Sequence, residues 1–387
     1  MEIASSLQLS YAVSENLPCT SRMQRVQRFY RPELDMLRFF AFLAVFVHHG
    51  IYNVFPILSI CGGFGLCFFF FLSAFLITEL LQRELELTGT VAIRDFYIRR
   101  ILRIWPLYFG VLLCSVLFGL AFSSYHLPTL FVLSYIFMLG NLYIGHFGFP
   151  TTFIGYLWSI SIEEQFYLLW PFLNRKLTRR ALTLAVGTLV PIGSVTVLWL
   201  AWMGETPAQG IWTNSLVQIQ VFAFGALTGL ALNGTVPKLM LRWRLILIVI
   251  GCALWGAVAA LSGIDARTAH SGWGPMVGYW GVGAGCLCFL LSALGVDQKL
   301  LPSGLVYLGK ISYGLYVFHQ VSLELASNLL NRIEGMDSSG HHTVFGVAHL
   351  ALGMLFTVII SAISYRYFEK TFLRWKDKFT VVRSRLA

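Results

Sequence analysis

The chain has 387 residues, of which 57% are hydrophobic and only 12% charged, and its formal net charge is +10. This composition excludes a soluble globular protein, because there is too little polar surface to cover it. The positive charge does not indicate nucleic-acid binding, since the lysines and arginines form short clusters between apolar segments, a pattern that orients membrane proteins. The seven cysteines show no paired spacing, so we expect no metal site.

Apolar segments long enough to span a bilayer recur along the whole chain. We therefore predict an all-α, polytopic integral membrane protein with about ten transmembrane helices. The predicted helices cover residues 34–56, 60–81, 101–121, 153–173, 181–203, 212–232, 244–262, 274–293, 303–323 and 345–367. With both termini in the cytoplasm, all but three of the 28 lysines and arginines lie on the cytoplasmic side, as the positive-inside rule requires.

Residues 129–147 are also apolar enough to cross, but a crossing here would put the basic cluster at 174–180 outside. We predict a re-entrant segment, or one buried among other helices. We expect a partly disordered cytoplasmic tail over residues 1–30 with no cleaved signal peptide. A transmembrane domain is expected over 31–370 and a basic cytoplasmic tail over 371–387.

The first predicted helix carries four ionisable residues, Asp35, Arg38, His48 and His49. Helical geometry puts Asp35, Arg38 and His49 on one stripe, with His48 beside it, and places His49 about 16 Å above Arg38. Ionisable residues at that depth are costly to bury and therefore indicate a functional site. We expect Asp35 to fix Arg38 and His49 to act as a general base. The alternative is a simple Asp35–Arg38 pair, with the histidines bonded to neighbouring helices.

The fourth predicted helix, WSISIEEQFYLLWP, holds Glu163 and Glu164 about ten residues from either end. Adjacent carboxylates point about 100° apart, so one of them is expected to face the cavity of His49 and to support it. An interhelical ion pair is an equally good interpretation.

The third predicted helix opens with FYIRRILRIWPLYF, which places Arg99, Arg100 and Arg103 on neighbouring turns. Like charges near a helix N-terminus are unfavourable unless an anion neutralises them. Guanidinium groups and free N–H groups there suit a phosphate. Orientation by the positive-inside rule is the alternative.

The remaining candidate residues lie on the first, fourth and ninth predicted helices. His48, Tyr313, His319 and Trp158 are candidates for binding the acceptor substrate, with His319 expected near the outer surface. A packed histidine is the alternative for His319. These constellations fit either an enzyme that uses a phosphorylated donor or a transporter of an anion.

Several stretches carry a resemblance, namely LDMLRFFAFLAVFVHH, FYIRRILRIWPLYF, WSISIEEQFYLLWP, SYGLYVFHQ and YRYFEKTFLRW. Together they resemble the membrane-bound acyltransferase 3 family over essentially the whole chain. Arg38 and His49 match an arginine and a histidine of that family's first helix, and Arg100 and Arg103 match its R-x-x-R motif.

The resemblance implies an O-acyltransferase in the plasma (inner) membrane. It would take an acyl group, usually acetyl, from acyl-coenzyme A and pass it to a carbohydrate hydroxyl at the outer face. A transporter or flippase, and acylation of a small cytoplasmic molecule, are the alternatives. A monomer and a homo-oligomer stay equally open, since lipid-facing and interface-facing helix surfaces look alike.

Overall fold

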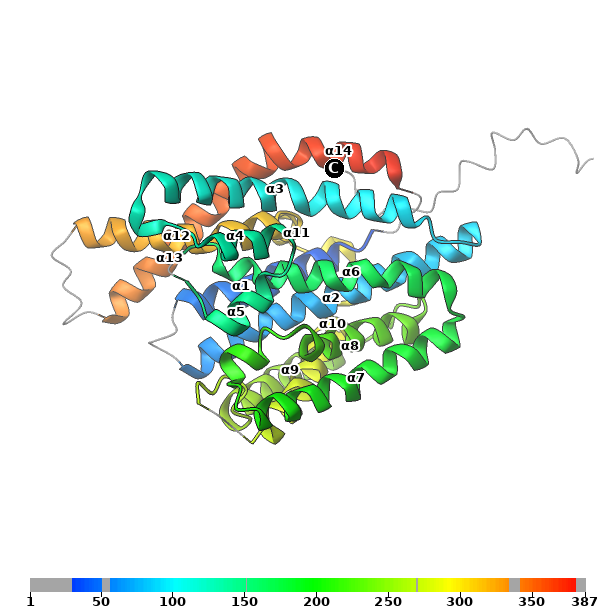
Figure 1. Cartoon of the computed structure of the whole chain (residues 1–387). Helices are drawn as coiled ribbons and strands as arrows, with labels where there is room; N and C mark the ends of the chain where they lie inside the picture. The colour runs from blue at the N-terminus through cyan, green and yellow to red at the C-terminus, as the bar shows by residue number, and fades with distance from the viewer. Residues whose placement is uncertain (1–29, 51–55, 151, 269–270, 334–341, 381–387) are drawn as a thin grey trace, which may run out of the picture.

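The computed structural model describes residues 30–50, 56–150, 152–268, 271–333 and 342–380. These residues form helices and no strand (Figure 1), which confirms the predicted all-α fold. Most of the tail predicted at residues 1–30 lies outside the described ranges.

The ten long helices are α1 (Pro32–Gly50), α2 (Pro56–Thr88), α3 (Ile93–Ala121), α6 (Trp158–Lys176), α7 (Arg179–Trp202), α8 (Ser215–Leu232), α9 (Leu241–Leu261), α10 (Trp273–Ala293), α12 (Ser312–Ile333) and α13 (His342–Ser364). The short α-helices are α4 (Thr129–Ile136), α5 (Gly140–Phe147), α11 (Ser303–Lys310) and α14 (Lys370–Lys376). A π-helical turn, Tyr365–Glu369, joins α13 to α14.

Seven helical segments of the described chain are long and apolar enough to cross a membrane: α2, α3, α7, α8, α9, α10 and the continuous stretch Phe345–Phe379. Helices α1, α6 and α12 have 19, 19 and 22 residues, which is also long enough to span. They carry ionisable residues singled out above, as α3 of the seven also does. The chain is therefore a multi-pass membrane protein.

The middle of the molecule is formed by α1, α2 and α6, with α14 and α3 toward one edge and α7 and α9 toward the other (Figure 1). Helix α2 packs against α1 and α8. Small residues let these helices approach closely. A Cβ atom on Gly65 would lie 2.4 Å from the carbonyl oxygen of Ala41, and one on Gly225 would lie 2.2 Å from that of Phe71. Helix α2 therefore packs closely against both α1 and α8.

Residues 129–147 form two helices of eight residues each, α4 and α5. Each is about 12 Å long, too short to cross a bilayer. The chain turns between them at Met138, whose φ is 56°. The Tyr108 hydroxyl donates to the Tyr135 carbonyl at 2.9 Å, and the Gln165 amide donates to the Met138 carbonyl at 2.9 Å. Protein groups thus satisfy the irregular backbone of a segment that does not cross, although apolar side chains such as Leu130 and Phe137 are exposed on its outer face.

The helix predicted over 303–323 is interrupted, because α11 ends at Lys310 and α12 begins at Ser312. The interruption lies where the chain touches α1, since a Cβ atom on Gly309 would be 1.7 Å from the carbonyl oxygen of Asp35. The start of the predicted C-terminal tail is also helical: it forms α14, which packs against α3.

Candidate functional site

Asp35 and Arg38 lie one turn apart on α1 and form the expected ion pair. Arg38 Nη1 donates to Asp35 Oδ1 at 3.0 Å, and the Tyr30 hydroxyl donates to Asp35 Oδ2 at 3.2 Å. Both charged side chains are buried. Two hydrogen bonds to the carboxylate offset part of the cost of its burial, and they hold Arg38 at the wall of a cavity.

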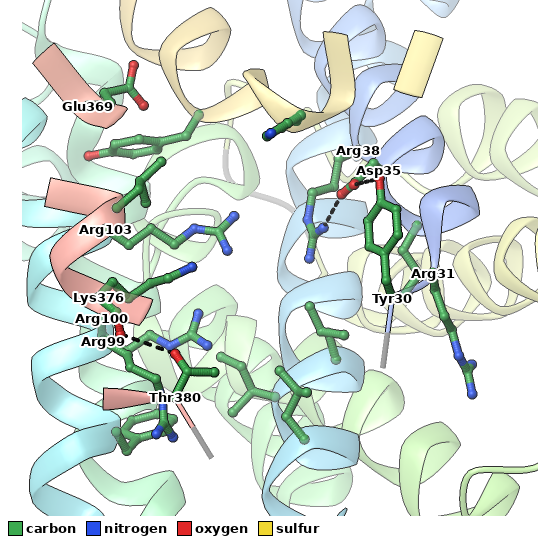
Figure 2. Close-up of a pocket in the computed structure, with 18 of the residues that line it drawn as sticks. Tyr30, Arg31, Asp35, Arg38, Arg99, Arg100, Arg103, Glu369, Lys376 and Thr380 are labelled. Carbon is green, nitrogen blue, oxygen red and sulfur yellow. Dashed lines mark hydrogen bonds and ion pairs between the residues drawn. The ribbon is translucent and has the colours of Figure 1, made fainter. Parts of the chain in front are cut away.

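That cavity, here called the basic cavity, lies between α1 and α2 on one side and α3 and α14 on the other (Figure 2). Its lining cations are Arg31, Arg38, Arg99, Arg100, Arg103, Lys310 and Lys376, and its lining carboxylates are Asp35, Glu84 and Glu369. Seven cations against three carboxylates attract a multivalent anion.

The three arginines of α3 have different surroundings. Arg99 is held by Glu84 at 3.1 Å and by the Phe379 carbonyl at 2.8 Å. Arg100 and Arg103 form no ion pair within the described residues, and Arg100 lies over the Tyr167 ring at 5.4 Å. Arg100 and Arg103 are therefore the better candidates for an anion, while Arg99 ties α3 to its neighbours.

One part of the expected anion site is corrected by the helix bounds. Helix α3 begins at Ile93, two turns before Arg100. The backbone N–H groups at Arg100 and Arg103 therefore lie inside the helix and are not available to a phosphate. Any anion here is held by side chains alone.

Sequence reasoning missed Lys376, whose ammonium group joins Arg100 and Arg103 on the α3–α14 wall of the basic cavity (Figure 2). Its one ion pair within the described residues is with the adjacent Asp377 at 3.7 Å. No local pattern distinguishes it from the other basic residues of this segment. Only the packing of α14 on α3 brings it to the site.

A second space, the middle cavity, is lined by Arg38, Arg100, Arg103, Ser73, Glu163, Tyr167 and Tyr313, among others. Glu163 Oε1 accepts hydrogen bonds from the hydroxyls of Ser73 and Tyr167. The four-residue step from Glu163 to Tyr167 is a sequence signal that could have found this contact. The Tyr313 hydroxyl donates to the Ile104 carbonyl at 2.8 Å.

A third space, the histidine cavity, is lined by His48, His49 and Trp158, together with Gln209, Trp212, Asp265, Arg267, Tyr316 and Gln320. The His48 ring is tied to Ser59, with Nδ1 2.8 Å from the Ser59 carbonyl. The His49 side chain forms no hydrogen bond within the described part of the chain, so its ring is the one left for chemistry.

The three cavities form a series. Arg38 and Tyr313 line both the basic and the middle cavity, and Leu66 and Tyr316 line both the middle and the histidine cavity. This series of cavities, here called the passage, runs along α1 from the arginines of α3 to His49.

Two expected positions differ from the structure. Neither glutamate contacts His49: Glu163 is bonded as described, and Glu164 accepts a hydrogen bond from the Trp105 indole at 3.2 Å. Helix α6 begins at Trp158, so both glutamates lie closer to its N-terminus than expected. His319 is fully buried behind His49, with no exposed surface, and does not line the histidine cavity.

The chain is similar to a known protein family and to several named proteins. A family model described as an acyltransferase domain matches residues 31–366. The "O-acetyltransferase OatA" of Staphylococcus aureus strain NCTC 8325 is 25% identical over 382 residues, covering 90% of this chain and 59% of that protein. No solved structure matches the chain.

Two further relatives are named for peptidoglycan. YrhL of Bacillus subtilis strain 168, named as a candidate peptidoglycan O-acetyltransferase, is 27% identical over 363 residues, covering 88% of this chain and 54% of that protein. The peptidoglycan O-acetyltransferase OatA of Listeria monocytogenes is 34% identical over 161 residues, covering 39% of this chain and 25% of that protein. The chain spans about half the length of these curated relatives, or less.

Proposed function

The chain belongs to the acyltransferase-domain family, and on this premise we propose that it is a membrane O-acyltransferase that moves an acetyl group from cytoplasmic acetyl-coenzyme A to a carbohydrate hydroxyl at the outer face of the plasma membrane. The observation that carries the proposal is the series of cavities from Arg100 and Arg103 to His49. A donor with phosphates at one end and a thioester at the end of a long thin arm fits such a passage.

In this scheme, the phosphates of the donor bind the guanidinium groups of the basic cavity, which recognise phosphate oxygens in a forked geometry. The arm passes Arg38 and the middle cavity. The acceptor enters the histidine cavity, where aromatic faces and amides such as Trp158, Trp212 and Gln209 suit a sugar. The likeness to relatives named for peptidoglycan supports a glycan acceptor.

His49 takes the proton of the acceptor hydroxyl as the hydroxyl oxygen attacks the thioester carbonyl. A carbon–oxygen bond forms and the carbon–sulfur bond breaks, and the proton on His49 passes to the departing thiolate. The products are the acetylated glycan and free coenzyme A.

The test uses the chain in proteoliposomes with radiolabelled acetyl-coenzyme A on one side and an oligomer of N-acetylglucosamine on the other. We expect label on the glycan together with release of one thiol for each acetyl group transferred. Loss of donor from its compartment with the thioester intact would instead identify a transporter. Label appearing only when donor and acceptor share a compartment would refute transfer across the membrane.

Lys376→Ala is expected to raise the KM for acetyl-coenzyme A by about 10- to 100-fold, the effect of one lost charge-assisted hydrogen bond. Lys378→Ala is the matched control, because Lys378 lies two residues further along and is exposed. The KM of each variant is measured from initial rates over a range of acetyl-coenzyme A concentrations. Equal KM values in the two variants would remove Lys376 from the donor site.

A further inference from the structure

His319 of α12 lies directly behind His49 of α1. The centroids of the two rings are 5.1 Å apart and their planes are inclined by 38°. His319 has no exposed surface, so it meets neither lipid nor the contents of the histidine cavity. Any effect of His319 on chemistry in that cavity has to act through a residue that lines the cavity, such as His49.

The protonation pattern of His319 follows from its hydrogen bond. Its Nδ1 lies 2.5 Å from the backbone carbonyl oxygen of Tyr316, one turn back on the same helix. A carbonyl oxygen only accepts, so Nδ1 carries the hydrogen, and Nε2 of the neutral ring is a lone-pair acceptor. That Nε2 is buried and has no hydrogen-bond partner within the described residues. A buried acceptor without a partner is costly and therefore rare in proteins.

The surroundings leave His49 as the group that His319 can serve. The Tyr156 ring lies 4.6 Å from the His319 ring and the Tyr316 ring 5.5 Å from it, but both hydroxyls are already bonded. The Tyr156 hydroxyl donates to the Val317 carbonyl, and the Tyr316 hydroxyl donates to the Tyr156 carbonyl at 3.0 Å.

The other titratable group that faces the pair is His48, whose ring lies 4.9 Å from that of His49. Its Nδ1 is tied to Ser59. No carboxylate of the described chain forms an ion pair with His49 or His319. In other enzymes a carboxylate orients the catalytic histidine and fixes its tautomer. Within the described residues, that role is left for another group to fill.

We propose that His319 is the positioning residue for His49. When the two rings turn to face each other, the Nε2 lone pair of His319 accepts a hydrogen bond from one N–H of the His49 imidazole. This bond fixes the tautomer in which the other His49 nitrogen faces the histidine cavity as the base. A neutral acceptor does this without burying a charge. The proposal rests on the proposed function, since it assigns a partner to the base of that reaction.

Two substitutions of similar size distinguish a hydrogen-bonding role of His319 from a role in packing alone. In His319→Asn the amide nitrogen can keep the bond to the Tyr316 carbonyl, but no acceptor reaches His49. In His319→Gln the longer amide can place an oxygen near the position of Nε2. We expect kcat for acetyl transfer to fall about 100-fold in the asparagine variant, with the KM for acetyl-coenzyme A unchanged. In the glutamine variant the fall should be under about 10-fold.

The assay is the acetyl-coenzyme A and N-acetylglucosamine-oligomer assay above, on protein that elutes as a single species in detergent. Wild-type kcat in the asparagine variant would overturn the proposal, and so would an equal loss in both variants. If the asparagine variant does not fold, His319→Met replaces it, because methionine fills the space and accepts hydrogen bonds only weakly. Lack of transfer by the wild-type chain would refute the proposed function, which is a distinct outcome.

Discussion

Replacing His49 with alanine is expected to lower kcat for acetyl transfer by about 10²- to 10⁴-fold, the usual contribution of a general base. The ring lines the histidine cavity, forms no hydrogen bond within the described residues and lies at the end of the passage from the basic cavity. Its loss would leave the acceptor hydroxyl without a base, while the phosphate-binding arginines stay in place. The KM for acetyl-coenzyme A should therefore change little.

A matched control for this variant is His146→Ala. His146 lies on α5 with an exposed side chain and lines none of the three cavities. The rate of acetyl transfer by the His146→Ala variant should equal that of the wild type. The measurement is initial-rate transfer of radiolabelled acetyl to the glycan at saturating donor, with expression and elution profile matched. A His49→Ala protein with wild-type kcat would exclude His49 as the base.

The second large effect is expected at the buried pair of α1. Arg38→Gln would leave Asp35, which is 1% exposed, without its guanidinium partner. Breaking a buried pair from one side typically costs about 3–5 kcal/mol, so the thermal midpoint of the detergent-solubilised protein should drop strongly. Transfer should fall as well, because Arg38 lines both cavities through which the donor arm is proposed to pass.

The double variant Asp35→Asn/Arg38→Gln separates these two effects. Neutralising both partners removes the stranded charge, so most of the lost thermal stability should return. Transfer should stay low, because the cation at the junction of the two cavities is still missing. Thermal unfolding followed by tryptophan fluorescence gives stability, and kcat/KM for acetyl-coenzyme A gives function. Recovery of both quantities together would reduce Arg38 to a structural partner of Asp35.

The parts of this architecture that depend on helix periodicity were predictable from the sequence. Asp35 and Arg38 are three residues apart, and that spacing alone predicts their contact. The charge pattern likewise predicts that residues 129–147 do not cross, and the structure resolves this segment into two short helices.

The parts that depend on contacts between distant segments were not predictable. Glu163 and Glu164 are bonded by Ser73 of α2 and Trp105 of α3, and periodicity gives only the direction of each glutamate side chain. Lys376 reaches the basic cavity because α13, a π-helical turn and α14 carry the chain back over α3. His319 was expected near the surface, since depth in a helix does not reveal which neighbours enclose a residue.

Three of the helices that carry candidate residues also differ from the others in how they would enter the membrane. Helices α1, α6 and α12 are absent from the set that is apolar enough to span by composition. Each charged side chain at the centre of a lone inserting segment costs about 2.5–3.5 kcal/mol. During synthesis, these three helices would therefore enter the lipid together with apolar neighbours, which are α2 for α1 and α6, and α13 for α12. Assembly of the candidate functional site would then coincide with completion of membrane insertion.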